Sequence, residues 1–152
     1  MTGLRAVLGA AILAAAACGS TATSPSDGTL RVTVTQNPTF TADSLSFTMQ
    51  VENISRNVVD LTFPSSCEVL PFFTDRAGRE IVPVGGGLVC ATVITRRSLA
   101  AGEKLNRSVD VKAGTAADGV FAVFPPGDYN LSARLMDTRF KLQSAPMPFS
   151  VR

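Results

Sequence analysis

Three cysteines, Cys18, Cys67 and Cys90, are the side chains with the most specific chemistry in this 152-residue sequence. Cys18 follows a basic start at Arg5, a short apolar run and four alanines. Charge, apolar core and small residues in that order are typical of a secretory signal. The apolar run is shorter than the roughly 20 residues that a membrane-spanning helix needs. We therefore predict that residues 1–17 are a signal peptide, which leaves Cys67 and Cys90 as a candidate pair.

Cys67 and Cys90 are 23 positions apart in a chain that the signal directs to an oxidising compartment. A disulfide persists in such a compartment, and closing this loop would stabilise the fold by about 3 kcal/mol. We predict the bond. The alternative is two buried, unpaired thiols, which behave as small apolar side chains. A metal site is not favoured, because neither histidine nor a second pair of thiols accompanies the two cysteines.

The sequence contains no histidine, which removes the commonest general base and the commonest metal ligand. None of the lysines stands in a Ser-x-x-Lys arrangement. Of the acidic residues, Asp75 is best explained as the residue that opens a turn. We therefore predict no catalytic residues, no metal and no cofactor. The chain has 14 basic and 12 acidic residues without a basic stripe, which argues against a nucleic-acid partner.

Four residues are candidates for binding a partner. Arg96 and Arg97 form the one local basic cluster, which would suit an acidic partner or lipid headgroups. Phe72 and Phe73 lie in one of the two richest apolar stretches, and exposed rings would create an apolar contact patch. The alternatives are solvated charges near a strand end for the arginines and core filling for the phenylalanines.

Residues 18–28 contain no large apolar side chain and are predicted to be a flexible tether. Residues 29–152 are predicted to form one domain. Within it, apolar and polar residues alternate with a period of two, which indicates half-buried strands. Short strands with frequent turns predict an all-β, antiparallel β-sandwich, with a closed barrel as the alternative. The apolar rows are Leu30, Val32 and Val34; Leu45, Phe47, Met49 and Val51; Val59, Leu61 and Phe63; Leu105, Val109 and Val111, interrupted by Arg107; Tyr129, Leu131, Ala133 and Leu135; and Met147, Phe149 and Val151.

Turn residues separate these rows. Residues 75–78 (Asp-Arg-Ala-Gly) predict a type I turn in which Gly78 takes a positive φ. Residues 53–57 link two strands, and Asn57 is expected in a left-handed conformation there. Pro125, Pro126 and Gly127 predict a reversal immediately before the Tyr129 row.

The stretch that ends at Cys18 resembles the lipobox of bacterial lipoproteins, in which the cysteine becomes the lipidated first residue. Ala15 stands where leucine is usual, and the alternative is an ordinary signal cleaved among the four alanines, which would leave a secreted protein. Gly19 follows the cysteine where aspartate would favour retention at the inner membrane. The resemblance implies an envelope protein that is anchored by lipid at Cys18, on the periplasmic face of the outer membrane.

Several segments in order resemble the BsuPI domain, a family named for an intracellular proteinase inhibitor. They are Val-Glu-Asn-Ile-Ser at 51–55, Val-Asp-Leu-Thr-Phe-Pro-Ser-Ser at 59–66, Asp-Arg-Ala-Gly-Arg-Glu-Ile-Val at 75–82, Leu-Ala-Ala-Gly-Glu at 99–103 and Pro-Gly-Asp-Tyr-Asn-Leu at 126–131. The resemblance spans about residues 44–136 and implies an immunoglobulin-like sandwich. Family members often carry an aromatic-acidic pair where this chain has residues 67–70, and tryptophans where it has residues 81–84.

Three functional hypotheses follow. The first is a non-catalytic, membrane-anchored binding or interaction domain of an envelope lipoprotein, which meets an unknown envelope protein through the loops at 63–71 and 84–90. The second, implied by the family resemblance, is an inhibitor of serine proteases, whose partner is a protease. The third is a structural accessory domain of an envelope assembly.

Overall fold

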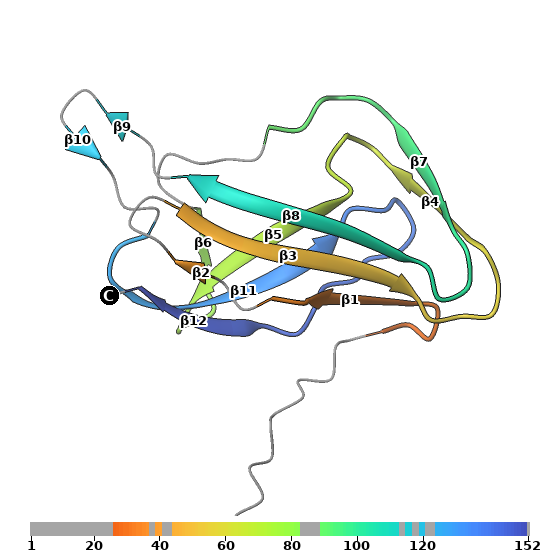
Figure 1. Cartoon of the computed structure of the whole chain (residues 1–152), viewed down its shortest axis with the longest axis horizontal. Coiled ribbons are helices and arrows are strands. Elements are labelled where there is room, and N and C mark those ends of the chain that lie inside the picture. The colour runs from red at the N-terminus through yellow and green to blue at the C-terminus, as the bar shows by residue number, and fades with distance from the viewer. Residues whose placement is uncertain are drawn as a thin grey trace, which may run out of the picture.

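A computed structural model describes residues 26–36, 39–40, 44–82, 89–112, 115–116, 119–120 and 124–151. The predicted signal peptide, Cys18, most of the predicted tether and the loop at 83–88 lie outside the described residues. The described residues form twelve strands (Figure 1). In chain order these are β1 (Leu30–Val34), β2 (Thr39–Phe40), β3 (Ser44–Asn53), β4 (Val59–Phe63), β5 (Val69–Asp75), β6 (Glu80–Ile81), β7 (Thr95–Leu99), β8 (Lys104–Lys112), β9 (Thr115–Ala116), β10 (Gly119–Val120), β11 (Gly127–Leu135) and β12 (Met147–Val151).

The first sheet is built around the long strand β3. Strand β8 runs antiparallel along one edge of β3, from the pair Ser44↔Lys112 to the pair Glu52↔Lys104. Strands β1 and β2 both pair with β3 as well, at its two ends. Because β8 occupies one edge over almost its whole length, β1 and β2 share the other edge.

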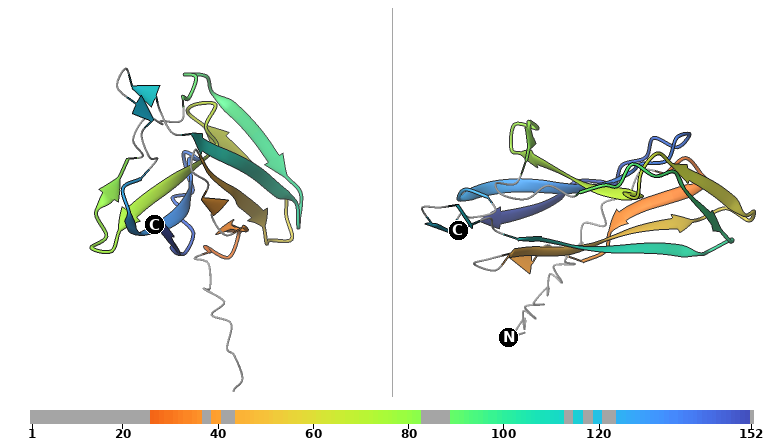
Figure 2. Two further views of the ribbon diagram at one scale, coloured as in Figure 1. Left: turned by 60° about the vertical axis from the view of Figure 1, so that its left-hand side comes forward. Right: turned by 90° about the horizontal axis from the view of Figure 1, so that it is seen from above.

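The second sheet has the strand order β12-β11-β5-β6, and its neighbours are antiparallel. Two shorter ladders, β4 with β7 and β9 with β10, complete the described strands. Seen from above, β11 and β12 form one layer, and β3 and β8 form the other (Figure 2). The described strands therefore make an antiparallel β-sandwich and not a closed barrel, and the prediction of an all-β sandwich is confirmed.

The core lies between the two layers and contains most of the predicted inward rows, together with residues such as Phe73 and Phe124 that belonged to none of them. Leu45, Phe47, Met49 and Val51 of β3 are all at most 2% exposed. From the second sheet, β11 supplies the row from Tyr129 to Leu135, and β5 supplies Phe73. Burial of each such large side chain stabilises the fold by about 1.5–3 kcal/mol. The period of two in the sequence therefore identified the buried face of these strands correctly.

A tyrosine hydrogen bond fixes the start of β11. The Tyr129 hydroxyl donates to the Pro125 carbonyl oxygen at 2.8 Å, across the reversal that the prolines predicted. A tyrosine near the start of this strand, bonded to backbone a few residues upstream, is a recurrent device of immunoglobulin-like sandwiches. This feature agrees with the immunoglobulin-like architecture that the family resemblance implied.

The other two predicted turns have different outcomes. Gly78 has a φ of 77°, as expected for the turn at 75–78. The left-handed conformation expected at Asn57 is wrong, since no non-glycine residue in the described part of the chain has a positive φ. The buried side chain of Asn53 organises that loop instead. Its amide donates to the carbonyl oxygens of Asn57 and Leu99, while its own oxygen accepts the Ser55 N–H.

The end of the predicted tether that the structure describes folds against the domain. The Asp27 carboxylate accepts the N–H groups of Thr29 and Leu30, at 2.8 and 2.9 Å. Gly28, between Asp27 and Thr29, has a φ of 83°. Residues 26–28 therefore form a turn that leads directly into β1. Among the described residues, no helix is long and apolar enough to cross a membrane.

Candidate functional site

The two inner cysteines join distant parts of the chain. The structure contains a disulfide between Cys67 and Cys90, with 5.4 Å between the Cα atoms. Cys67 lies just before β5, and Cys90 lies in the connection that leads into β7 (Figure 1). The predicted bond therefore fastens the connection onto the loop between β4 and β5.

Hydrogen bonds extend this fastening over the next residues. The Ser66 N–H donates to the Ala91 carbonyl oxygen at 3.0 Å, and the Ala91 N–H donates to the Ser66 hydroxyl at 2.8 Å. At the other end, the Thr95 hydroxyl donates to the Ser65 carbonyl oxygen at 3.1 Å. Thr95 is also the first residue of β7 and pairs with Phe63. Residues 90–95, which we call the tied segment, are thus held at both ends.

The middle of the tied segment is exposed and apolar. Ile94 is 66% exposed and Val93 is 49% exposed. Val89, directly before the disulfide, is 97% exposed. These are three of the five large apolar side chains that are exposed in the described part of the chain; the others are Val58 and Val82. In Figure 1 the tied segment runs in green along the upper edge of the view before it enters β7. Exposed apolar side chains on a fixed segment are a feature of binding surfaces.

A buried carboxylate supports the base of the tied segment. Glu68, next to Cys67, has a side chain that is only 2% exposed. Its Oε1 is 2.7 Å from Nε of Arg97 on β7, and its Oε2 contacts Nη2 of Arg107 on β8. The Glu68 carbonyl oxygen also accepts the Met136 N–H. Glu68 therefore links the loop before β5 to β7, β8 and the end of β11.

The positions of both arginines explain how they reach this acid. Arg97 pairs with buried Leu61, and Arg107 pairs with buried Met49. Paired residues point to the same face of an antiparallel ladder, so both arginines stand on inward faces at the rim of the sandwich. Their side chains are about half exposed. Sequence reasoning missed the role of Glu68, and its one signal was Arg107, a cation in an otherwise apolar row.

The four predicted partner-binding residues therefore differ in what they offer. Arg96 is exposed, as expected of either a contact residue or a solvated charge. Arg97 is engaged by Glu68. Phe73 is 3% exposed, and its ring centroid lies 5.0 Å from that of Phe124 and 5.9 Å from that of Phe47. Its ring is not available to a partner, because it faces the opposite sheet, and the core-filling alternative holds for it.

Phe72 points to the opposite face of β5 from Phe73. It pairs with Ser132 of β11, whereas Phe73 pairs with Leu131, which belongs to the hydrophobic core. The guanidinium carbon of Arg134 lies 3.9 Å from the centroid of the Phe72 ring. Phe72 is therefore half-buried under a cation on the outer face of the second sheet.

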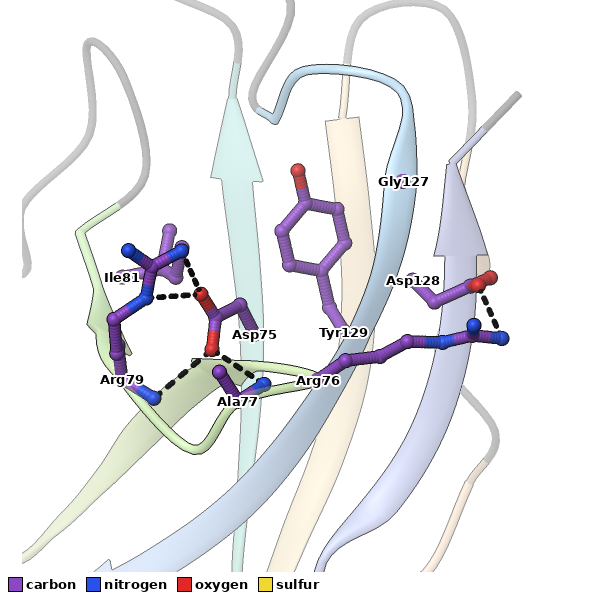
Figure 3. Close-up of a pocket in the computed structure, with 8 residues that line it drawn as sticks. All are labelled: Asp75, Arg76, Ala77, Arg79, Ile81, Gly127, Asp128 and Tyr129. Carbon is purple, nitrogen blue, oxygen red and sulfur yellow. Dashed lines mark hydrogen bonds and ion pairs between the residues drawn. The ribbon is translucent and has the colours of Figure 1, made fainter.

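A second structural feature is a shallow pocket at the turn between β5 and β6, lined by residues that include Asp75, Arg79 and Tyr129 (Figure 3). Asp75 accepts the N–H groups of Ala77 and Arg79 and the guanidinium of Arg79. The backbone N–H of Arg79, followed by its guanidinium, lowers the pKa of Asp75 below its ordinary value of 3.8. On the other side, Arg76 and Asp128 form an ion pair at 2.7 Å. The charges of this pocket are thus paired with each other.

Asp75 serves the turn, as the sequence indicated, and is not free to bind an ion. Among the described residues, no group of three or more histidine, cysteine, aspartate or glutamate side chains lies close enough to hold a metal. The most chemically distinctive arrangement in the described part of the chain is therefore the tied segment with Glu68 beneath it, which suits binding.

Comparison with known families decides what kind of domain this is. A family profile described as "BsuPI: Intracellular proteinase inhibitor" matches residues 30–140. The chain belongs to the BsuPI family. The match confirms the resemblance seen over residues 44–136 and extends it at both ends. The BsuPI region includes both cysteines of the disulfide, Glu68 and the whole tied segment. None of the curated proteins compared with the chain matches it.

Some solved structures share features with the BsuPI domain at low identity. One is a beta-glucosidase from Kluyveromyces marxianus, with 14% identity over 82% of this chain and 14% of that chain, and a TM-score of 0.45. A second is beta-glucosidase 3B from Thermotoga neapolitana, with 14% identity over 83% of this chain and 16% of that chain, and a TM-score of 0.45. A third is a beta-glucosidase from Listeria innocua, with 12% identity over 85% of this chain and 16% of that chain, and a TM-score of 0.43. The chain spans only a small part of these enzymes, and nothing about its function follows from the likeness.

Proposed function

We propose that this BsuPI domain inhibits a serine proteinase and that it contacts the enzyme through the tied segment. The family description supports an inhibitor. The observation that carries the choice of segment is its fastening at both ends, by the Cys67–Cys90 bond and by Thr95, with apolar side chains exposed between. This is the second of the three hypotheses raised by the sequence.

Rigidity is what the tied segment contributes to inhibition. A free peptide that enters an active-site cleft loses conformational freedom, at about 0.5–1.5 kcal/mol for each immobilised side chain. A segment that is already fixed loses less and binds more tightly. It also resists hydrolysis, since the two ends of a cut segment would stay in place. The disulfide, the Ser66 contacts and the Glu68 ion pairs all act on the base of this one segment.

Titration against enzymes tests the proposal. The purified protein is added in increasing molar ratio to subtilisin-type and other serine proteinases, and residual activity is measured on a small chromogenic peptide. We expect stoichiometric loss of activity for at least one enzyme. A variant with Cys67→Ser and Cys90→Ser should inhibit at least about tenfold less well, because its segment must be ordered on binding. Unchanged activity of every enzyme at high molar excess would contradict the proposal.

We also propose that the domain is held at a bacterial cell envelope by lipid on Cys18. The support is the order of charge, apolar core and alanines before this cysteine. Mass spectrometry of the protein extracted from membranes should find an acylated cysteine as the first residue, and Cys18→Ser should move the protein to the soluble fraction. An unmodified first residue other than Cys18 would contradict the anchor and leave the inhibitor proposal untouched.

A further inference from the structure

The tied segment has very few side chains between its two fixed ends. Only these side chains are candidates for insertion into the specificity pocket of an enzyme. Cys90 is held by the disulfide, Ala91 by Ser66, and Thr95 by Ser65 and by the ladder with β4. Only Thr92, Val93 and Ile94 lie between them. This inference rests on the proposed inhibitory function.

We propose that the Ile94 side chain enters the primary specificity pocket of the target enzyme, so that the target prefers aliphatic residues of medium size. Ile94 is the most exposed apolar side chain between the fixed ends, at 66% against 49% for Val93. The Val93 N–H is turned back onto the Ala91 carbonyl oxygen at 2.9 Å, which closes a tight turn around Thr92. Ile94 follows this turn and directly precedes the anchored Thr95.

Other exposed residues nearby are less suited to this role. Val89 is 97% exposed but precedes the disulfide, so it lies outside the fixed part. Arg96 and Arg97 follow Thr95, and their backbone is already paired with Thr62 and Leu61 of β4. The side chain of Arg97 is also held by Glu68. No cation of the described chain therefore lies between the two anchors of the segment.

The chemistry of isoleucine sets the class of target. A pocket with a carboxylate at its base, as in trypsin, would be left with an unpaired buried charge by an aliphatic side chain. A small or medium apolar pocket, as in elastase, buries the side chain without such a penalty. The inferred target is thus a serine proteinase of elastase-like preference, and trypsin-like enzymes are expected to escape.

A charge switch at single positions tests this inference. Four forms of the purified protein are compared against an elastase and against trypsin: the natural sequence, Ile94→Arg, Val93→Arg and Val58→Arg. Val58 is 64% exposed in the loop between β3 and β4 and serves as the matched control. The natural form should inhibit the elastase at least about 100-fold more tightly than trypsin, by the usual range of pocket discrimination. Ile94→Arg should reverse that preference, while Val58→Arg should leave the inhibition constants for both enzymes unchanged.

The outcomes separate the two proposals. A switch to trypsin by Val93→Arg but not by Ile94→Arg overturns the assignment of Ile94, as does elastase inhibition that Ile94→Arg leaves unchanged. In both cases the natural form still inhibits, so the proposed function stands. Failure of the natural form to inhibit any serine proteinase overturns both. Circular dichroism of each variant shows that its strands are intact, which is expected because both substituted side chains of the segment are exposed.

Discussion

Glu68 shows how much a single side chain can depend on its partners. Its carboxylate is removed from water, and both of its oxygens meet an arginine. Taking one partner from a buried ion pair is strongly destabilising, because the remaining charge is left without compensation. The arginines are about half exposed, so water could hydrate each of them if Glu68 were absent. Water could not hydrate the buried Glu68 carboxylate if the arginines were absent.

Arg107→Ala should therefore lower the free energy of unfolding by about 3 kcal/mol, the lower end of the usual range, because Arg97 remains beside Glu68. The matched control is Arg96→Ala, in an exposed position on β7, which should change the free energy by less than about 0.5 kcal/mol. Urea denaturation of the three proteins gives both values. Equal effects of the two substitutions would show that Glu68 is not the acid that Arg107 serves.

Asp75 makes the stability of the turn depend on pH. Its folded-state pKa is lowered, first by the Arg79 backbone N–H and also by the Arg79 guanidinium, whereas the unfolded chain has the ordinary value of 3.8. The ionised form therefore favours the folded state. This contribution is fully present above about pH 4 and is lost as the pH falls through the folded-state pKa.

Asp75→Asn should accordingly destabilise the protein at neutral pH and lose its effect in acid. Urea midpoints of both proteins are compared between about pH 2 and about pH 7. The difference between the two urea midpoints should be constant near neutral pH. It should become smaller below pH 3.8, the ordinary pKa of an aspartate. A gap of constant size down to the lowest pH would mean that the charge of Asp75 does not stabilise the turn.

Among the larger elements, the tied segment depends most on a covalent constraint. The disulfide closes a loop of 23 residues that crosses from the start of β5 to the entry of β7. The bond reduces the conformational entropy of the unfolded chain, and this stabilises the folded state by about 3 kcal/mol for a loop of this length. The same constraint keeps Ala91 opposite Ser66.

Reduction of the Cys67–Cys90 bond should lower the free energy of unfolding by about 3 kcal/mol. Chemical denaturation with and without a reductant measures the difference. In the variant with both cysteines replaced by serine, the reductant should have no effect, which controls for its other actions. A natural protein whose unfolding midpoint is the same with and without reductant would contradict the stabilising role of the bond.

On the scale of the whole molecule, aromatic rings hold the two sheets together. Phe73 of the second sheet meets Phe47 of the first in an edge-on contact and also touches Phe124 and Phe149. Phe72, its neighbour, faces away from the core and lies under Arg134. Two adjacent, chemically identical side chains therefore have different structural roles: Phe73 packs in the core, and Phe72 packs on the outer face.

Phe73→Ala should lower the free energy of unfolding by about 3–5 kcal/mol, as expected for a cavity in a core. Phe72→Ala should have a clearly smaller effect, because it removes a half-buried ring and leaves the contact between the sheets intact. Thermal or urea unfolding of the pair distinguishes the two. Similar losses for both variants would mean that Phe72 contributes to the core as much as Phe73 does.

The amino-acid sequence by itself determined which face is buried in the strands that alternate apolar and polar residues, such as β3 and β11. The unbroken alternation from Leu45 to Val51, whose apolar members are all buried in the structure, is sufficient for that inference. Asp75 and Gly78 likewise specified their turn, since the hydrogen bonds of Asp75 and the positive φ of Gly78 are local. The family, too, could be recognised from segments in order along the chain.

Only the tertiary structure decided what the polar residues do. Glu68 meets Arg97 and Arg107 across 29 and 39 residues of sequence. The buried carboxylate of Asp137 accepts the Thr62 N–H from 75 residues away. Whether Phe72 or Phe73 faces the core depended on the register of β5 against β11. The physical reason is range: alternation and turns arise between near neighbours in the chain, whereas ion pairs, register and the fastening of the tied segment exist only once the two sheets have packed.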